Sequence, residues 1–243
     1  MKMHRIITDE EWTTRHLSEE NWAENYWKSR DDPHRLFLIE KICKYAPLNR
    51  ILEVGCASGP NLYHVAKRFP EADVRGIDIS PVAAQKGNEW FKQAGLLNVK
   101  LEVGKAQDLK QFADKSFDVV FTDAVLIYIS PNKIKQTVRE MLRISRVVVL
   151  NEWHTFNKWR AFILNSLYYF KSILFARQQF KTIKFSIISK TSLGLFVGHW
   201  ARDYRMLFEE FVPKKSVYIT KLPNKLWDDK NWQKWGAIIE VVT

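Results

Sequence analysis

The stretch Ile51-Leu52-Glu53-Val54-Gly55-Cys56-Ala57-Ser58-Gly59 decides the fold. Its first four residues are mostly apolar, which is typical of a buried strand, and the small residues after them form a turn directly before a helical pattern. Small residues in such a turn let a ligand approach the backbone closely, and the next helix presents its unpaired N–H groups to that ligand. The stretch predicts a strand, a ligand-binding turn and a helix.

Outward from this turn, short apolar runs alternate with amphipathic stretches up to residue 150. The predicted strands are 51–54, 74–79, 99–103, 117–122 and 147–150, and the predicted helices are 61–69, 81–93 and 133–144. Strands that are continuous Val/Ile/Leu runs and alternate with helices are typical of parallel sheets covered on both faces. We expect an α/β fold with a doubly wound, mostly parallel sheet.

The flanks of this core have a different character. We expect 1–48 to be an N-terminal helical segment, 49–152 the α/β core, 153–200 an inserted helical cap, and 201–243 the completion of the sheet. The cap is rich in aromatic and basic residues, and its apolar part at 161–176 is too short to span a bilayer. In the last part we expect a helix at 201–211 and strands at 216–221 and 236–242.

Composition bounds the class of protein. The 243 residues are 46% hydrophobic, enough for a sizeable core in a single domain. Two cysteines and no apolar leader at the start favour a cytoplasmic protein without disulfides or a metal site. The formal charge of +11 is concentrated in 151–243, which has 15 Lys and Arg against 7 Asp and Glu. Such an excess favours anionic partners, and solubility alone explains it equally well.

Asp78 makes the ligand-binding turn more informative. It ends the second predicted strand, 19 positions after Gly59, where a carboxylate can accept hydrogen bonds from both hydroxyls of an adenosine ribose. Its alternative role is to cap the next helix, for which Ser80 is better placed. The G-x-G-x-x-G spacing of hydride-transferring dehydrogenases is absent, because Ala57 and Pro60 break it. A nucleoside-containing cofactor other than a nicotinamide is expected.

Three segments together resemble the class I S-adenosylmethionine-dependent methyltransferases: 53–59, 76–78 and 116–120. The resemblance implies a Rossmann-like methyltransferase fold with seven strands, a reversed final strand and S-adenosyl-L-methionine as cofactor. It implies cofactor contacts from Glu53, Gly55, Ala57, Gly59, Asp78, Ile79, Ala106, Gln107, Asp123 and Arg30.

Two positions depart from the family pattern. Ala57 replaces a second glycine, which we expect to be compatible with ordinary φ values. Lys105 stands where an acid often contacts the adenine amino group, so adenine is expected to be held by backbone near Ala106, assisted by Gln107 or Asp108.

Catalytic candidates come from the carboxyl ends of the strands, where ligands of open α/β sheets bind. Asp123 follows the fourth predicted strand, and Glu152 and His154 follow the fifth; His199 comes from the cap. Each can accept a proton from a methyl acceptor, with His154 preferred to His199, although an ordinary surface or packing role is the more common one for any single residue of this kind. Nearer the start, the aromatic residues Trp22, Tyr26 and Trp27, with Arg30, either fold over the cofactor or dock a helix on the core.

The resulting functional hypothesis is a methyltransferase acting on a small-molecule or glycan acceptor, on oxygen. The hypothesis includes an anionic or lipid-linked acceptor, with peripheral membrane contact through the cap. Two alternatives remain open: an RNA-modifying methyltransferase, against which stands the absence of an RNA-binding motif, and a catalytically silent binding module of the same fold. The acceptor atom and the oligomeric state are not encoded in any motif.

Overall fold

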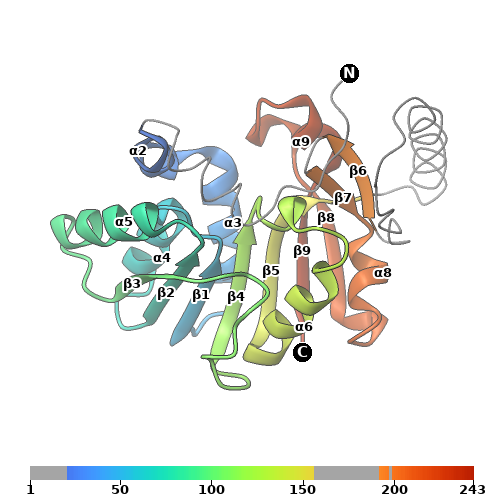
Figure 1. The fold of residues 1–243 in the computed structure, drawn as a ribbon, viewed down its shortest axis with the longest axis horizontal. Helices are drawn as coiled ribbons and strands as arrows, with labels where there is room; N and C mark the ends of the chain where they lie inside the picture. Colours follow the sequence, from blue (N-terminus) through green and yellow to red (C-terminus); the bar gives the residue numbers. More distant parts are fainter. Residues whose placement is uncertain (1–20, 156–191, 197–198) are drawn as a thin grey trace, which may run out of the picture.

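The computed structural model describes residues 21–155, 192–196 and 199–243. Its main sheet has seven strands in the order β3-β2-β1-β4-β5-β9-β8 (Figure 1). The strands are β1 (Arg50–Val54), β2 (Asp73–Asp78), β3 (Val99–Val103), β4 (Phe117–Asp123), β5 (Ser145–Trp153), β8 (Val217–Lys221) and β9 (Gly236–Val242). Strands β1 to β5 pair in parallel, and β9 runs antiparallel to both β5 and β8. The predicted doubly wound sheet with a reversed final strand is confirmed.

Helices cover both faces of this sheet (Figure 1). One face packs against α3 (Pro33–Cys43), α4 (Pro60–Arg68) and α5 (Pro81–Gln93), and the other against α6 (Ile134–Ile144) and α8 (Tyr204–Phe208). Helix α6 shows why these segments are helical: Ile134, Val138, Met141 and Leu142 are buried at the spacing of one helical face. Burial of such stripes on the two faces of the strands forms two hydrophobic clusters, one on each side of the sheet.

Shorter elements lie around the carboxyl ends of the strands. They are α2 (Trp22–Lys28), η1 (Ser29–Asp31), η2 (Leu126–Tyr128), η4 (Asn224–Leu226), α9 (Lys230–Trp235) and a two-stranded sheet of β6 (Ser192–Phe196) and β7 (His199–Arg202). At the opposite end of the sheet, η3 (Lys214–Ser216) precedes β8. The carboxyl ends of β1, β4 and β5 are therefore surrounded by segments from both ends of the chain.

Two predicted boundaries were wrong. The strand predicted at 147–150 extends to Trp153, because β9 pairs with it through Gly236. The helix predicted at 201–211 is shorter: Ala201 and Arg202 pair with β6, and the helix begins only after Asp203, whose side chain accepts the Met206 N–H. The predicted apolar stretch at 161–176 lies outside the described residues, as does the first part of the predicted N-terminal helical segment.

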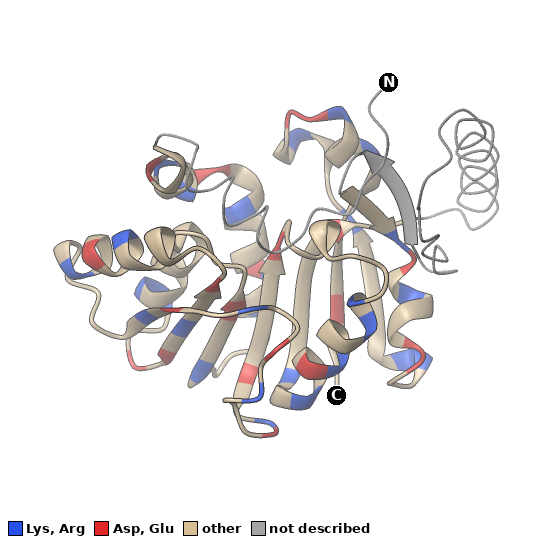
Figure 2. Cartoon of the chain, viewed as in Figure 1, with Lys and Arg blue, Asp and Glu red and all other residues tan. Residues whose placement is uncertain are grey.

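Charge is mixed over the described surface. Figure 2 shows Lys and Arg interspersed with Asp and Glu along the outer helices. Of the 15 Lys and Arg in 151–243, seven fall in 156–191, a segment without acidic residues that lies outside the described part of the chain. The strong basic excess inferred from the sequence is therefore concentrated in that segment. No helix in the described part of the chain combines the length and apolar character needed to cross a bilayer.

Candidate functional site

The turn after β1 has an unusual backbone. Gly55, Ala57 and Gly59 have φ values of 74°, 48° and 83°, in the left-handed region. The N–H groups of Gly55 and Cys56 both donate to the carbonyl of Ile77, at 2.7 and 3.0 Å, which ties the turn to β2. The expectation of an ordinary φ at Ala57 was wrong. A non-glycine residue in this region is strained by about 1–2 kcal/mol, so the fold holds Ala57 in the shape that a glycine would adopt freely.

Asp78 is hydrogen-bonded directly to this turn. Its Oδ2 accepts the Ala57 N–H at 2.8 Å, and its Oδ1 accepts the Ser80 N–H at 2.8 Å. Burial raises the pKa of the Asp78 carboxyl, and the backbone N–H groups oppose that rise. Helix α5 is capped by Ser80, whose Oγ accepts from the Ala83 N–H, so the capping alternative for Asp78 falls away. Each Asp78 oxygen keeps a lone pair with which to accept a hydroxyl.

A second group of polar side chains lies on the α3 and α4 side of the sheet. Asp123 Oδ2 accepts from Arg35 Nη1 at 2.7 Å, and Asp123 Oδ1 accepts from Asn151 Nδ2 at 2.8 Å. Asn61 Nδ2 donates to Glu53 Oε1 at 2.6 Å and to Asp123 Oδ2 at 3.2 Å. We call Arg35, Glu53, Asn61, Asp123 and Asn151 the polar cluster. It joins the ends of β1, β4 and β5 to helices α3 and α4.

Three buried polar atoms in and beside the polar cluster lack hydrogen-bond partners among the described residues. They are Glu53 Oε2, Asn151 Oδ1 and His34 Nε2, the last 3.9 Å from Asp123 Oδ2. Leaving such atoms unpaired costs about 1–3 kcal/mol each, and burial also raises the pKa of Glu53 well above its ordinary value. Asn151 Oδ1 is a pure acceptor, and Glu53 Oε2 is one when the carboxyl is ionised. A ligand carrying an ammonium group has the donors that they lack, and the α-amino group of a bound amino acid fits this description.

Glu152 is turned to the other face of the sheet. Its Oε1 accepts from Thr122 Oγ1 and from the N–H groups of Val125 and Leu126, at 2.8–2.9 Å, and its Oε2 accepts from the Ile127 N–H at 3.0 Å. The side chain is fully buried, and burial raises its pKa to about 7 against the effect of these donors. Its position organises the turn from β4 into η2.

The two candidate histidines differ in their surroundings. His154 is buried, its Nδ1 accepts the Tyr204 N–H at 3.3 Å, and burial lowers its pKa to about 4. His199 is half-buried and lies between two aromatic rings, 4.8 Å from Tyr128 and 5.7 Å from Trp153. Of the two, His199 has the more open position.

The N-terminal aromatic residues dock α2 on the core. Trp27 contacts Trp90, Phe91 and Tyr63, with ring centroids 5.2–5.6 Å apart, while the rings of Trp22 and Tyr26 lie 4.8 Å apart and are tilted by 47°. Arg30 lies over Trp27 and Tyr63 and donates to the carbonyl of Trp27. It is Arg35, and not Arg30, that reaches the polar cluster.

The segment after β3 lies next to Asp78. The Gly104 N–H donates to the Asp78 carbonyl at 2.9 Å, and the Gln107 carbonyl accepts from Gln136 Nε2 at 3.0 Å. Ala106 packs against the cluster of apolar residues on the α6 side. The backbone of Gly104 is thus held beside Asp78, and Ile79 follows Asp78 directly.

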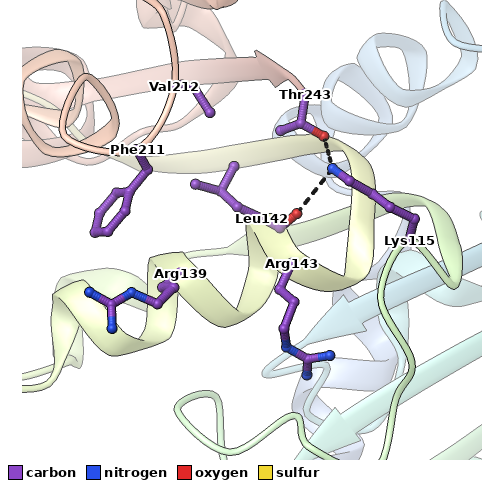
Figure 3. Close-up of a pocket in the computed structure, with 7 residues that line it drawn as sticks. All are labelled: Lys115, Arg139, Leu142, Arg143, Phe211, Val212 and Thr243. Carbon is purple, nitrogen blue, oxygen red and sulfur yellow. Dashed lines mark hydrogen bonds between the residues drawn. The ribbon is translucent and has the colours of Figure 1, made fainter.

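A separate pocket lies at the opposite end of the sheet. Figure 3 shows it between the C-terminal half of α6 and the segment at Phe211 and Val212. The pocket has a volume of about 360 Å³. Its cations are largely engaged: Lys115 donates to the carbonyls of Ser145 and Leu142, and Arg143 pairs with Asp114 and Glu140. These contacts join α6 to the loop before β4, and the pocket is remote from the turn at 55–59.

Arg35, His34 and Asn61 were not identified from the sequence, whereas Asn151 follows the fifth predicted strand. One signal could have indicated Arg35: it precedes Leu38, Ile39 and Ile42 by three, four and seven positions and so shares their buried stripe on α3. A charged residue on an apolar helical stripe needs a buried partner. No comparable signal marks Asn61.

Comparisons with known proteins agree with this geometry. A family model described as "Methyltransferase domain" matches residues 51–147. A ubiquinone/menaquinone biosynthesis C-methyltransferase of Geotalea daltonii is 33% identical over 148 residues, which cover 58% of this chain and 59% of the relative. The chain spans about half the length of the first curated relatives that it matches.

Solved structures show the same fold. The PH0226 protein of Pyrococcus horikoshii has a TM-score of 0.58 at 15% identity, and the match covers 94% of this chain and 98% of that one. A geranyl diphosphate methyltransferase, solved with GPP and sinefungin, has a TM-score of 0.54 at 14% identity and covers 86% and 77% of the two chains. Residues 51–147 are therefore similar to methyltransferase domains, and the described part of the chain has the fold of a solved methyltransferase.

Proposed function

We propose that this protein binds S-adenosyl-L-methionine at the ends of β1, β2 and β4 and methylates a small-molecule acceptor on oxygen. One observation carries the proposal: the turn at 55–59 has a ribose acceptor, Asp78, on one side and the polar cluster, with its unpaired buried acceptors, on the other. An adenosine joined to an amino acid has matching groups at both ends. A nicotinamide dinucleotide has no ammonium group for the second position.

Each end of the cofactor then has named partners. Asp78 would accept the ribose hydroxyls, and backbone of 104–107, together with Ile79, would contact adenine. Glu53 Oε2 and Asn151 Oδ1 would accept from the α-ammonium group, and the Arg35 guanidinium lies where the α-carboxylate would approach the polar cluster. Gly55, Ala57 and Gly59 keep the turn close to the ligand. When bound, the cofactor supplies an electrophilic methyl group on a positively charged sulfur.

A hydroxyl acceptor must also lose a proton. We propose His199 as the group that receives it, because this side chain is half-buried beside Tyr128 and Trp153 at the carboxyl ends of the strands. Glu152 and Asp123 are already surrounded by donors, and His154 faces Tyr204; these three residues are proposed to position the site. His199→Asn is expected to lower kcat and to remove an ionisation from its pH profile, while the affinity for cofactor stays unchanged.

The remaining parts of the functional hypothesis are proposals as well. A glycan, anionic or lipid-linked acceptor, and any contact with a membrane surface, would involve the basic segment 156–191. A cytoplasmic location is supported by Cys43 and Cys56, which are both free thiols. Boundaries at 48, 152 and 200 would separate parts of a single domain, since the sheet includes strands from both sides of each inserted segment.

Calorimetric titration with S-adenosylhomocysteine tests the cofactor site. Asp78→Asn is expected to weaken binding at least about tenfold, since it replaces a charged acceptor of hydrogen bonds by an amide. Asp73→Asn is the matched control, because Asp73 lies on the same strand but pairs with Arg75 near the surface. Equal affinities of the wild-type protein and the Asp78 variant would contradict the ribose assignment.

A second variant separates the two ends of the ligand. Glu53→Gln is expected to weaken the affinity for S-adenosylhomocysteine and to leave the affinity for 5′-methylthioadenosine, which lacks the amino acid, unchanged. Equal losses for both ligands would contradict the assignment of the ammonium site. A folded protein that binds neither ligand would instead support the silent-module alternative.

A further inference from the structure

Two buried side chains of opposite charge hold the segment 125–129, which follows β4 and contains η2. Glu152 accepts three backbone N–H groups of this segment. The Arg202 guanidinium instead donates to its carbonyls, from Nη1 to Leu126 and from Nη2 to Ile129. We call Glu152 and Arg202, together with the segment that they hold, the loop clamp. Its N–H groups face the negative charge and its carbonyls face the positive one.

Stability alone does not explain the charges of the loop clamp. The Arg202 side chain is fully buried, and its guanidinium donates to backbone carbonyls, including that of Trp200 at 3.4 Å. Glu152 is fully buried as well. Replacing buried charges by apolar side chains of similar volume is often neutral or stabilising. What the two charges do provide is direction, because each forms hydrogen bonds of defined geometry to backbone groups of one segment.

The clamped segment contacts the proposed site near both of its ends. Val125 covers the turn after β1, since a Cβ added to Gly55 would lie 2.4 Å from the Val125 side chain. Near the other end, the ring of Tyr128 has its centroid 4.8 Å from that of His199. His199 and Arg202 are the first and last residues of β7. Strand β7 therefore contains both the proposed proton acceptor and the guanidinium that fixes the segment.

We propose that Arg202 is a positioning residue for methyl transfer, which acts by fixing segment 125–129. The segment in turn holds Val125 against the turn after β1 and the Tyr128 ring beside His199. This inference rests on the proposed function and adds to it a residue that need not touch cofactor or acceptor. Because a misplacement of about 1 Å can slow a reaction by about 100-fold, a clamp that borders both the turn and His199 helps to set the rate.

Arg202→Met tests this role, because methionine has a similar length and no donor. It removes both bonds to the segment, whereas a glutamine at Glu152 can keep three of the four bonds there. Calorimetric titration with S-adenosylhomocysteine is expected to show at least about tenfold weaker binding. Arg143→Met is the matched control, since Arg143 also donates to two backbone carbonyls, those of Leu109 and Phe112, before β4. This control should keep the wild-type affinity, even where urea denaturation shows that both variants lose stability.

Amide hydrogen exchange locates the effect within the chain. The N–H groups of 125–127 bond to Glu152 and not to Arg202. In Arg202→Met they are expected to exchange at least about tenfold faster, relative to the amides of β1, because the loop clamp opens as a unit. Arg202→Lys keeps the charge but has one nitrogen for two carbonyls, so it should weaken S-adenosylhomocysteine binding by only about threefold.

The outcomes separate this inference from the proposed function. Wild-type affinity in Arg202→Met would overturn the positioning role, and so would wild-type affinity in Arg202→Lys if the methionine variant does not fold. An equal loss of affinity in Arg143→Met would also overturn it, because the effect would then follow from stability. A wild-type protein that binds no S-adenosylhomocysteine contradicts the proposed function itself, whereas one that binds it as tightly as the Arg202 variants do contradicts only the role of Arg202.

Discussion

Replacing Glu152 by glutamine tests whether this buried carboxylate builds the site or takes part in the reaction. In the wild-type protein the carboxylate accepts four hydrogen bonds, three of them at Oε1 and one, from the Ile127 N–H, at Oε2. A glutamine whose oxygen occupies the Oε1 position keeps the three bonds and turns its NH₂ group toward the Ile127 N–H. The opposite orientation would lose three bonds and is disfavoured.

The expected cost follows from this geometry. Losing one hydrogen bond to a charged group, and weakening three others by removing the charge, is expected to lower the free energy of unfolding by about 2–4 kcal/mol. For a domain of this size such a loss lowers Tm by roughly 5–15 °C. Glu240→Gln is the matched control: Glu240 is a buried carboxylate that accepts a hydrogen bond from the Tyr45 hydroxyl, and its replacement should cost about 1 kcal/mol.

Urea denaturation measures the stability of both variants, and steady-state kinetics measure their kcat. If Glu152 has only a positioning role, Glu152→Gln loses stability, and its remaining folded fraction keeps its affinity for S-adenosylhomocysteine. A variant as stable as the wild-type protein whose kcat falls 100-fold or more would refute this reasoning and would make Glu152 a catalytic residue.

Three further predictions concern buried or strained positions. The pKa of His154 in the folded protein is lowered to about 4, so between pH 6.5 and 4 the unfolded chain binds more protons than the folded one. The free energy of unfolding therefore decreases as the pH falls through this range. His154→Asn should remove at most about 3 kcal/mol of that decrease, which urea denaturation across the same pH range measures. Gly55→Ala should lower the free energy of unfolding by about 3 kcal/mol or more, because φ is 74° and the new Cβ would lie 2.4 Å from Val125. Gly95→Ala, with φ 71° and no described atom within 4 Å of the new Cβ, should lower it by only about 1 kcal/mol. Equal thermal shifts of the two variants would contradict this prediction. Ala57→Gly should raise the free energy of unfolding by about 1 kcal/mol by relieving a φ of 48°, and no change in urea midpoint would show that the strain is absent.

The strands and helices of the cofactor-binding core were predictable because their signals are local. Helix α5 was predicted with the bounds observed, Pro81–Gln93, and β9 likewise, Gly236–Val242. The end of β5 was not predicted, because residues 151–153 owe their strand conformation to pairing with β9, more than 80 residues away. Periodicity within a segment contains no information about such a partner.

The polar cluster was predicted only in part, for the same reason. Glu53 and Asp123 were identified from the sequence because they lie within or directly after predicted strands. Asn151 and Glu152 are neighbours in the sequence, yet their side chains point to opposite faces of the sheet. Which face meets the cofactor depends on where α3 and α4 pack. Arg35 reaches Asp123 across 88 positions of sequence, so its role appears only when both elements are in place.

The sequence by itself determined the order of strands and helices, the turn at 55–59 and the carboxylate at 78, since apolar periodicity and small residues act over a few neighbouring positions. Only the tertiary structure decided that Ala57 adopts a left-handed conformation and that Arg35 lies beside Asp123. The physical reason is that side chains along a strand point alternately to the two faces of the sheet, and the strand's own sequence does not say which face borders the site. That choice is made only when helices from distant parts of the sequence pack on the sheet.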